Sequence, residues 1–169
     1  TTAVYYGTIH QRANQILADV CIDKGQRAII GKVVMDNTDQ CPDYYRDAST
    51  QAAIDGTSEF LEYVKNHGKN IENKVNVAVT PRFIPSCTDE ALNALGDLAS
   101  SHSSYIQTHC SESDWEHNYV IERCGKSDTE ALMEYGLLTE STILAHGNFI
   151  SENDMDLIKE QGAGIAHCP

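Results

Sequence analysis

The stretch YIQTHCSES, residues 105–113, ends a short β-type run with a histidine and, three positions later, a glutamate. His109 and Glu112 are of the types best suited to binding a metal ion and to moving a proton. A Zn²⁺ ion held at the end of a strand lowers the pKa of its water from about 15.7 to about 7. A glutamate just beyond the strand can take that proton and pass it to a substrate. The spacing therefore predicts metal-assisted hydrolysis.

A histidine and a glutamate three residues apart also occur by chance in many proteins, so this pair alone is weak evidence. The alternative is a histidine that merely ends a strand, beside a solvated acid. A second histidine, His146 in the segment LAHG, follows another strand-like run and strengthens the hydrolytic interpretation. Beside the first histidine, it could orient the attacking hydroxide and stabilise it.

Polar side chains follow most of the predicted strands. These strands are short and mostly continuous in apolar residues, as expected of strands buried on both faces, and they cover residues 2–9, 28–35, 75–80, 105–108, 142–145 and 164–166. Five of the six precede a potential ligand, acid, base or guanidinium: His10, Arg82 with Phe83, His109 with Glu112, His146 and His167. In a barrel such strand ends converge on one rim, whereas an open sheet spreads them along an edge. The sequence therefore predicts a (β/α)₈ barrel.

Helical patterns alternate with these strands. They cover residues 11–27, 49–66, 88–102, 113–138 (two helices interrupted near Gly125) and 151–162, and residues 36–48 form a loop. Strand–helix alternation favours a parallel sheet with right-handed crossovers. The competing architecture, an open doubly wound sheet, typically has a glycine-rich phosphate loop directly after a strand. Here Gly162 and Gly164 precede a strand instead, which again favours the barrel.

Charge and composition narrow the partners. The 169 residues include 12 Lys and Arg against 25 Asp and Glu, for a formal net charge of −13. That field repels a polyanion, so we expect no nucleic-acid polymer as partner, whereas a small neutral or cationic substrate is compatible with it. No apolar run approaches the roughly 18 residues of a membrane span. We expect a cytoplasmic protein with no membrane partner.

The cysteines are scattered rather than paired. Six are present, with no C-x-x-C spacing: Cys21, Cys41, Cys87, Cys110, Cys124 and Cys168. Structural zinc sites use paired cysteines, so reduced thiols are the prediction. Cys110 follows His109 directly. Because successive strand side chains point to opposite faces, we expect Cys110 to be a small buried residue rather than a metal ligand.

Taken together, the segments TPRF, THCSES, LAHG and GIAHCP, in this order and spacing, resemble the guanine deaminases of the amidohydrolase superfamily. TTAVYYGTIH and GQRAIIGKVVMD are similar to the strands that precede these motifs in the family. The similarity runs over all 169 residues, and the ordered set is far more specific than any one member. The resemblance implies a zinc-dependent (β/α)₈ barrel that converts guanine to xanthine and ammonia.

The resemblance also implies roles for individual residues. His109 matches the metal ligand on the fifth barrel strand, and Glu112 matches the proton shuttle. His146 matches the histidine of the sixth strand, beside the attacking water. Arg82 and Phe83 match the residues that hold the purine, the first by hydrogen bonds and the second by packing, and His109 and Glu112 also face the substrate. In this chemistry water attacks C2, Glu112 protonates the ring nitrogen, and ammonia leaves.

The chain also departs from the family pattern. The His-x-His pair of the first strand and the aspartate ligand after the eighth have no counterpart in it. By register, residues 1–169 form one incomplete barrel domain that supplies strands two to seven. We therefore expect the isolated segment to be inactive and prone to aggregation, because two apolar sheet edges would be open. In the full-length protein, the resemblance implies a homodimer.

Two alternative functions remain open at this point. One is another amidohydrolase that acts on a different aminated heterocycle, or on a chlorotriazine. The other is a non-catalytic remnant that keeps the sheet as an interaction surface. For the remaining candidate residues we expect no chemistry: His67, His102 and His117 are predicted to be solvated, and Trp115 and the tyrosines to pack helices on the outer face of the barrel.

Overall fold

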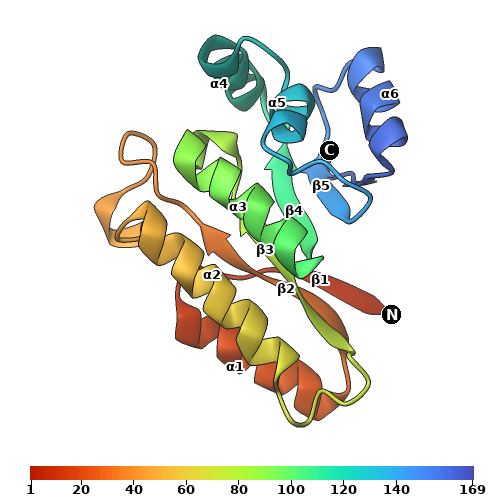
Figure 1. Cartoon of the computed structure of the whole chain (residues 1–169). Helices are drawn as coiled ribbons and strands as arrows, with labels where there is room; N and C mark the ends of the chain where they lie inside the picture. Colours follow the sequence, from red (N-terminus) through yellow and green to blue (C-terminus); the bar gives the residue numbers. More distant parts are fainter.

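Six parallel strands form one sheet in the computed structural model, which describes residues 1–169 (Figure 1). They are β1 (Thr2–Tyr6), β2 (Arg27–Val34), β3 (Val75–Pro81), β4 (Tyr105–Cys110), β5 (Thr142–His146) and β6 (Gly164–Ala166). Neighbours in the sheet are also neighbours in sequence, from β1 to β6. A doubly wound sheet would reverse its strand order at a switch point. The sequential order confirms the barrel architecture.

The sheet curls, and a buried side chain marks the curvature. Gln107 on β4 is fully buried, and its Nε2 donates to the carbonyl oxygen of Tyr5 on β1 at 2.9 Å and to Oγ1 of Thr80 at 3.1 Å. In a flat sheet, three strand spacings would separate β1 from β4 by about 14 Å. The six strands therefore form a curled half-barrel with Gln107 on its concave face. Only glycine fits at position 31, because a Cβ atom there would clash with the side chains of Thr80 and Gln107.

Helices cover the convex face. They are α1 (Gln11–Lys24), α2 (Thr50–Lys65), α3 (Asp89–His102), α4 (Asp114–Cys124), α5 (Asp128–Glu134) and α6 (Glu152–Gln161). Five of these helices begin with a serine or threonine whose side chain caps the N-terminus, as expected of these residue types: Ser49, Thr88, Ser113, Ser127 and Ser151. Figure 1 shows α1, α2 and α3 lying next to one another against the sheet.

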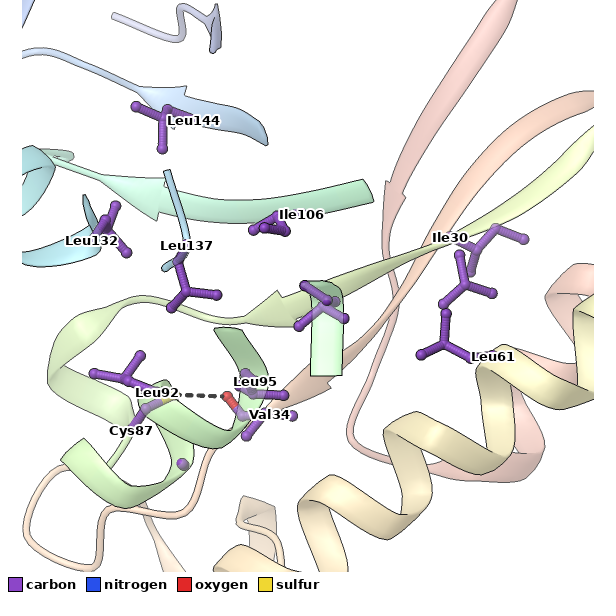
Figure 2. Packing of buried hydrophobic residues seen from close by; sticks show 14 of the residues in the cluster. Ile30, Val34, Leu61, Cys87, Leu92, Leu95, Ile106, Leu132, Leu137 and Leu144 are labelled. Carbon is purple, nitrogen blue, oxygen red and sulfur yellow. Dashed lines mark hydrogen bonds between the residues drawn. The ribbon is translucent and has the colours of Figure 1, made fainter. Parts of the chain in front are cut away.

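The main core lies between the sheet and these helices. It is a cluster of 27 buried residues to which alternate strand positions contribute, among them Val75, Val77 and Val79 of β3. Figure 2 shows Ile30, Ile106 and Leu144 from strands packing with leucines from helices and connecting segments. The concave face instead carries polar residues such as Gln107 and Thr80. All three residues of β6 are exposed, unlike the buried strand that the sequence predicts.

The strand ends differ slightly from the sequence prediction, and the differences matter for the site. β4 continues to Cys110, so His109 belongs to the strand and Glu112 to the turn after it. β1 ends at Tyr6, and beyond it the chain bends at Ile9 after the side chain of Asn14 has bonded the backbone of Thr8. The predicted loop 36–48 contains one short 3₁₀ helix (Asp43–Tyr45).

We predict that Gln107→Leu lowers the free energy of unfolding by about 1–3 kcal/mol, because the half-buried Tyr5 carbonyl then loses the donor that the buried Gln107 amide supplies. Chemical denaturation of the full-length protein that contains this chain measures the effect. Gln51→Leu, at an exposed position of α2, is the matched control and should change stability by less than about 0.5 kcal/mol. Equal effects of the two substitutions would contradict the bridging role.

Candidate active site

The predicted site residues meet at the carboxyl ends of the strands. A cavity of about 490 Å³ opens there, and it is lined by Tyr6, Gly7, Val33, Met35, Pro42, Tyr44, Tyr45, Arg82 and His109. The lining comes from the ends of β1, β2 and β4 and from the segments that follow β2 and β3. In parallel α/β barrels this face is where substrates bind.

His109 is held in one tautomer by the neighbouring strand end. The carbonyl oxygen of Arg82 accepts from the backbone N–H of His109 at 3.0 Å and lies 2.7 Å from its Nδ1. A carbonyl oxygen only accepts, so Nδ1 carries the proton and Nε2 keeps its lone pair. Burial lowers the pKa of His109, which favours the neutral ring. The Tyr6 ring packs against it, with 4.2 Å between centroids.

His146 reaches the site through an unusual backbone conformation. Leu144, two residues earlier on β5, faces the helix-side core, so regular alternation would send His146 to that side as well. His146 instead has a φ of 79°, a region that non-glycine residues seldom adopt. Its ring stacks on His109 with centroids 5.6 Å apart, and its Nδ1 lies 2.9 Å from the carbonyl oxygen of Cys168.

Glu112 lies beside both histidines in the turn after β4. Its Oε1 is 3.7 Å from Nε2 of His146, and its side chain is 49% exposed. Asn148 donates from Nδ2 to the Glu112 carbonyl oxygen at 3.0 Å. Glu116 accepts the backbone N–H of Glu112 at 2.8 Å. The structure therefore brings His109, Glu112 and His146 together, as their places at the strand ends indicate.

Arg82 and Phe83 lie at the same rim but differ in position. The Arg82 guanidinium lines the cavity, is exposed, and forms no hydrogen bond or ion pair within the chain, so its donors are available to a ligand. It lies over the Phe83 ring, with its Cζ 5.0 Å from the centroid. Phe83 does not line the cavity, and its ring packs against Trp115 at 6.3 Å.

Sequence reasoning missed several residues around this site. Tyr6 and Tyr45 line the cavity instead of packing helices on the outer face, and Trp115 lies against Phe83 beside the rim. Asn148 and Glu116 fix the main chain of Glu112. The signal that could have found them is that Asn148 comes shortly after His146 and Glu116 shortly after Glu112. This signal is weak, because asparagine and glutamate occur at many solvated turns.

Other sequence predictions are confirmed or corrected by the structure. All six cysteines are free, and Cys110 is fully buried on the helix side, near Thr129. The prediction of solvated histidines is wrong: each is at most 25% exposed and near a carboxylate, in the pairs His67–Asp19, His102–Glu62 and His117–Asp128. Helix-to-helix packing creates these pairs, and sequence spacing does not reveal it.

The chain by itself offers an incomplete metal site. His109 directs an unprotonated Nε2 toward the rim, as a zinc ligand must. However, no group of three or more histidine, cysteine, aspartate or glutamate side chains could hold a metal ion. His109 therefore fits the role of one ligand among several.

The helices of this chain all lack the length and hydrophobicity that a membrane span needs.

The amidohydrolase family model matches residues 1–169, and the chain belongs to that family. The guanine deaminase of Mus musculus is 39% identical over 173 aligned residues, which cover 100% of this chain and 37% of that protein. The chain thus spans a little over a third of the length of this relative.

Solved structures give the same relationship. A guanine deaminase from C. acetobutylicum, with guanine bound in its active site, superimposes with a TM-score of 0.92 at 30% identity. The match covers 100% of this chain and 39% of that one. An adenosine deaminase from Xanthomonas campestris with bound zinc, at 20% identity and a TM-score of 0.78, shares the fold and covers 92% of this chain and 33% of that one.

The buried carboxyl group of Glu116 makes the stability of the fold depend on pH. Burial is the main cause that raises its pKa to about 8, the Asp128 and Glu112 carboxylates add to it, and the hydrogen bond from the Glu112 backbone and the Arg82 guanidinium oppose it. Between about pH 5 and 8 the folded state keeps a proton that the unfolded chain releases, so the free energy of unfolding falls as pH rises. We predict that Glu116→Gln, which cannot lose a proton, gains stability relative to the parent by up to about 1.4 kcal/mol per pH unit in this window.

Denaturation of both proteins at several pH values measures the difference. Glu130→Gln is the matched control, because Glu130 occupies the same position in α5 without the deep burial. A Glu116→Gln curve that stays parallel to the parent curve from pH 5 to 8 would contradict the prediction.

Proposed function

We propose that the full-length protein that contains this chain is a zinc-dependent guanine deaminase, which hydrolyses guanine to xanthine and ammonia. One observation carries the proposal: His109, Glu112 and His146 meet at the rim of a cavity that an unpaired Arg82 guanidinium also lines. Similarity to guanine deaminases over the whole chain supports it.

His109 would hold zinc through Nε2, and the remaining ligands would come from parts of the protein outside residues 1–169. When bound, zinc makes water acidic enough to act as a nucleophile near neutral pH. Glu112 takes one water proton and delivers it to the ring nitrogen as the water oxygen bonds to C2. It then passes the second proton of that water to the amino group, so that the C2–N bond breaks, ammonia leaves and the oxygen stays on C2 as the xanthine carbonyl. His146, with Nε2 toward Glu112, orients the water.

Arg82 would select the purine by its polar edge. Its guanidinium donates to the guanine carbonyl oxygen, and Phe83 supports the guanidinium from below. Adenine has no carbonyl group to receive these bonds.

The six free thiols support a cytoplasmic location, where thiols stay reduced. The family resemblance supports a homodimer.

The direct test is release of ammonia from guanine by the purified full-length protein, with adenine, cytosine and ammelide as competing substrates. Guanine should be turned over fastest. No ammonia from guanine, with turnover of another heterocycle, would replace the substrate but keep the reaction class. No turnover of any of them would favour a non-catalytic role.

We predict that Glu112→Gln lowers kcat for guanine by about 10²- to 10⁴-fold, because the amide cannot shuttle a proton. The thermal midpoint should change little, since the side chain is half exposed. Steady-state ammonia release and thermal unfolding measure the two effects. Glu122→Gln, at an exposed position of α4, is the control. Full activity of Glu112→Gln would remove Glu112 from the mechanism.

We predict that Arg82→Met lowers kcat/KM for guanine by about 10- to 150-fold, because charged hydrogen bonds to the substrate contribute about 1.5–3 kcal/mol. Methionine keeps the apolar stem and removes the donors. Any slow turnover of adenine should be unaffected. Arg12→Met, at an exposed position of α1, is the control. An equal loss on guanine and adenine would contradict the assigned contact.

A further inference from the structure

A buried glutamate lies behind the proposed proton shuttle. The side chain of Glu116 is in the first turn of α4 and the residue is only 1% exposed. Its Oε2 accepts the backbone N–H of Glu112 at 2.8 Å, and its Oε1 is buried without a partner. No role in the proposed chemistry requires this residue, so its burial needs another explanation.

Comparison with two other helices shows that the contact of Glu116 differs from ordinary capping. In α5 and α6, Glu130 and Asp154 occupy the same third helical position and accept the backbone N–H of the capping serine. In α4 the capping residue is Ser113, yet Glu116 accepts the N–H of the residue before it, Glu112. The side chain thus holds the residue proposed to move the proton.

Other contacts fix the same turn from the opposite side. Ser111 has a φ of 51° and donates from Oγ to the buried Asp128 carboxylate at 2.8 Å. The side chain of Asn148 donates to the Glu112 carbonyl oxygen, and its backbone N–H donates to the Ser111 carbonyl oxygen at 2.9 Å. The Glu112 peptide groups are therefore held at both ends, and the freedom that remains is in its side chain.

We propose that Glu116 is a positioning residue that fixes the Glu112 main chain, so that the Glu112 carboxylate stays within reach of the substrate ring nitrogen. The inference rests on the proposed function of Glu112. Its physical basis is that a reacting group displaced by about 1 Å can lose about 10²-fold in rate. Buried supporting side chains are the usual means of preventing such displacement.

The charge state of Glu116 agrees with this role. The carboxyl groups of Asp128 and Glu112 and the guanidinium of Arg82 are the charged groups that affect it, and burial raises its pKa to about 8. At neutral pH Glu116 is mostly protonated, so it places little second negative charge beside Glu112. A neutral carboxyl group still accepts the N–H through its carbonyl oxygen, and a glutamine amide can do the same.

The test compares Glu116→Met, which fills the space without an acceptor, with Glu116→Gln, which keeps the acceptor. Both are made in the full-length protein, and Glu130→Met is the matched control at the same position of α5. We expect Glu116→Met to lower kcat about 10- to 100-fold with KM changed by less than about threefold. Glu116→Gln should keep kcat within about threefold of the parent. Glu130→Met should lower the thermal midpoint without lowering kcat.

Each of several results would overturn the proposal. If Glu116→Gln loses as much kcat as Glu116→Met, the carboxyl proton itself is required. If Glu116→Met keeps the parent kcat, the contact does not position Glu112. If Glu130→Met loses as much kcat as Glu116→Met, the effect is general destabilisation.

Should Glu116→Met not fold, a large kcat loss in Glu116→Gln overturns the proposal, and a kcat near that of the parent supports it. If the parent deaminates another heterocycle instead of guanine, only the proposed substrate fails, and the same comparison is made on that heterocycle.

Discussion

The curvature of the sheet organises this chain. The buried amide of Gln107 can form its hydrogen bond to β1 only because the sheet curls. Its contact with the Tyr5 carbonyl oxygen joins β4 to β1 across the concave face, and a flat sheet would keep these strands far apart. The same curvature brings the Tyr6 ring onto His109. Without it, the strand ends would lie along an edge, and the cavity lined by Tyr6, Arg82 and His109 would not form.

Parallel pairing then aligns the strand ends with one another. His109 of β4 pairs with Ala145 of β5 and Cys110 pairs with His146, so His109 and His146 lie one residue apart in register where the two strands end. The backbone N–H of His109 bonds the Arg82 carbonyl oxygen, which places Arg82 one strand away. Three side chains from different parts of the sequence thus meet because the register of the sheet fixes where each strand ends.

The site combines a hydrogen-bonded main chain with one half-exposed carboxylate. Both histidines place Nδ1 beside a carbonyl oxygen at a neighbouring strand end, which leaves Nε2 directed toward the rim. The positive φ of His146 is a local strain of the kind that functional sites retain, because it turns the ring out of the helix-side core. Glu112 keeps a half-exposed side chain on a fixed backbone, an arrangement suited to repeated proton transfer.

Local signals in the sequence specify the order and type of the elements, because short apolar runs, capping serines and terminating glycines act within a few residues. The sequence also indicates which polar residues lie at or just beyond strand ends, including Arg82, His109, Glu112 and His146. Three features could not be read from these signals: His146 turns against the alternation of its strand, Phe83 packs on Trp115 outside the cavity, and Glu116 accepts a hydrogen bond from the Glu112 backbone. The physical reason is that such contacts depend on backbone dihedrals and on packing between distant segments, and residue spacing along one chain specifies neither.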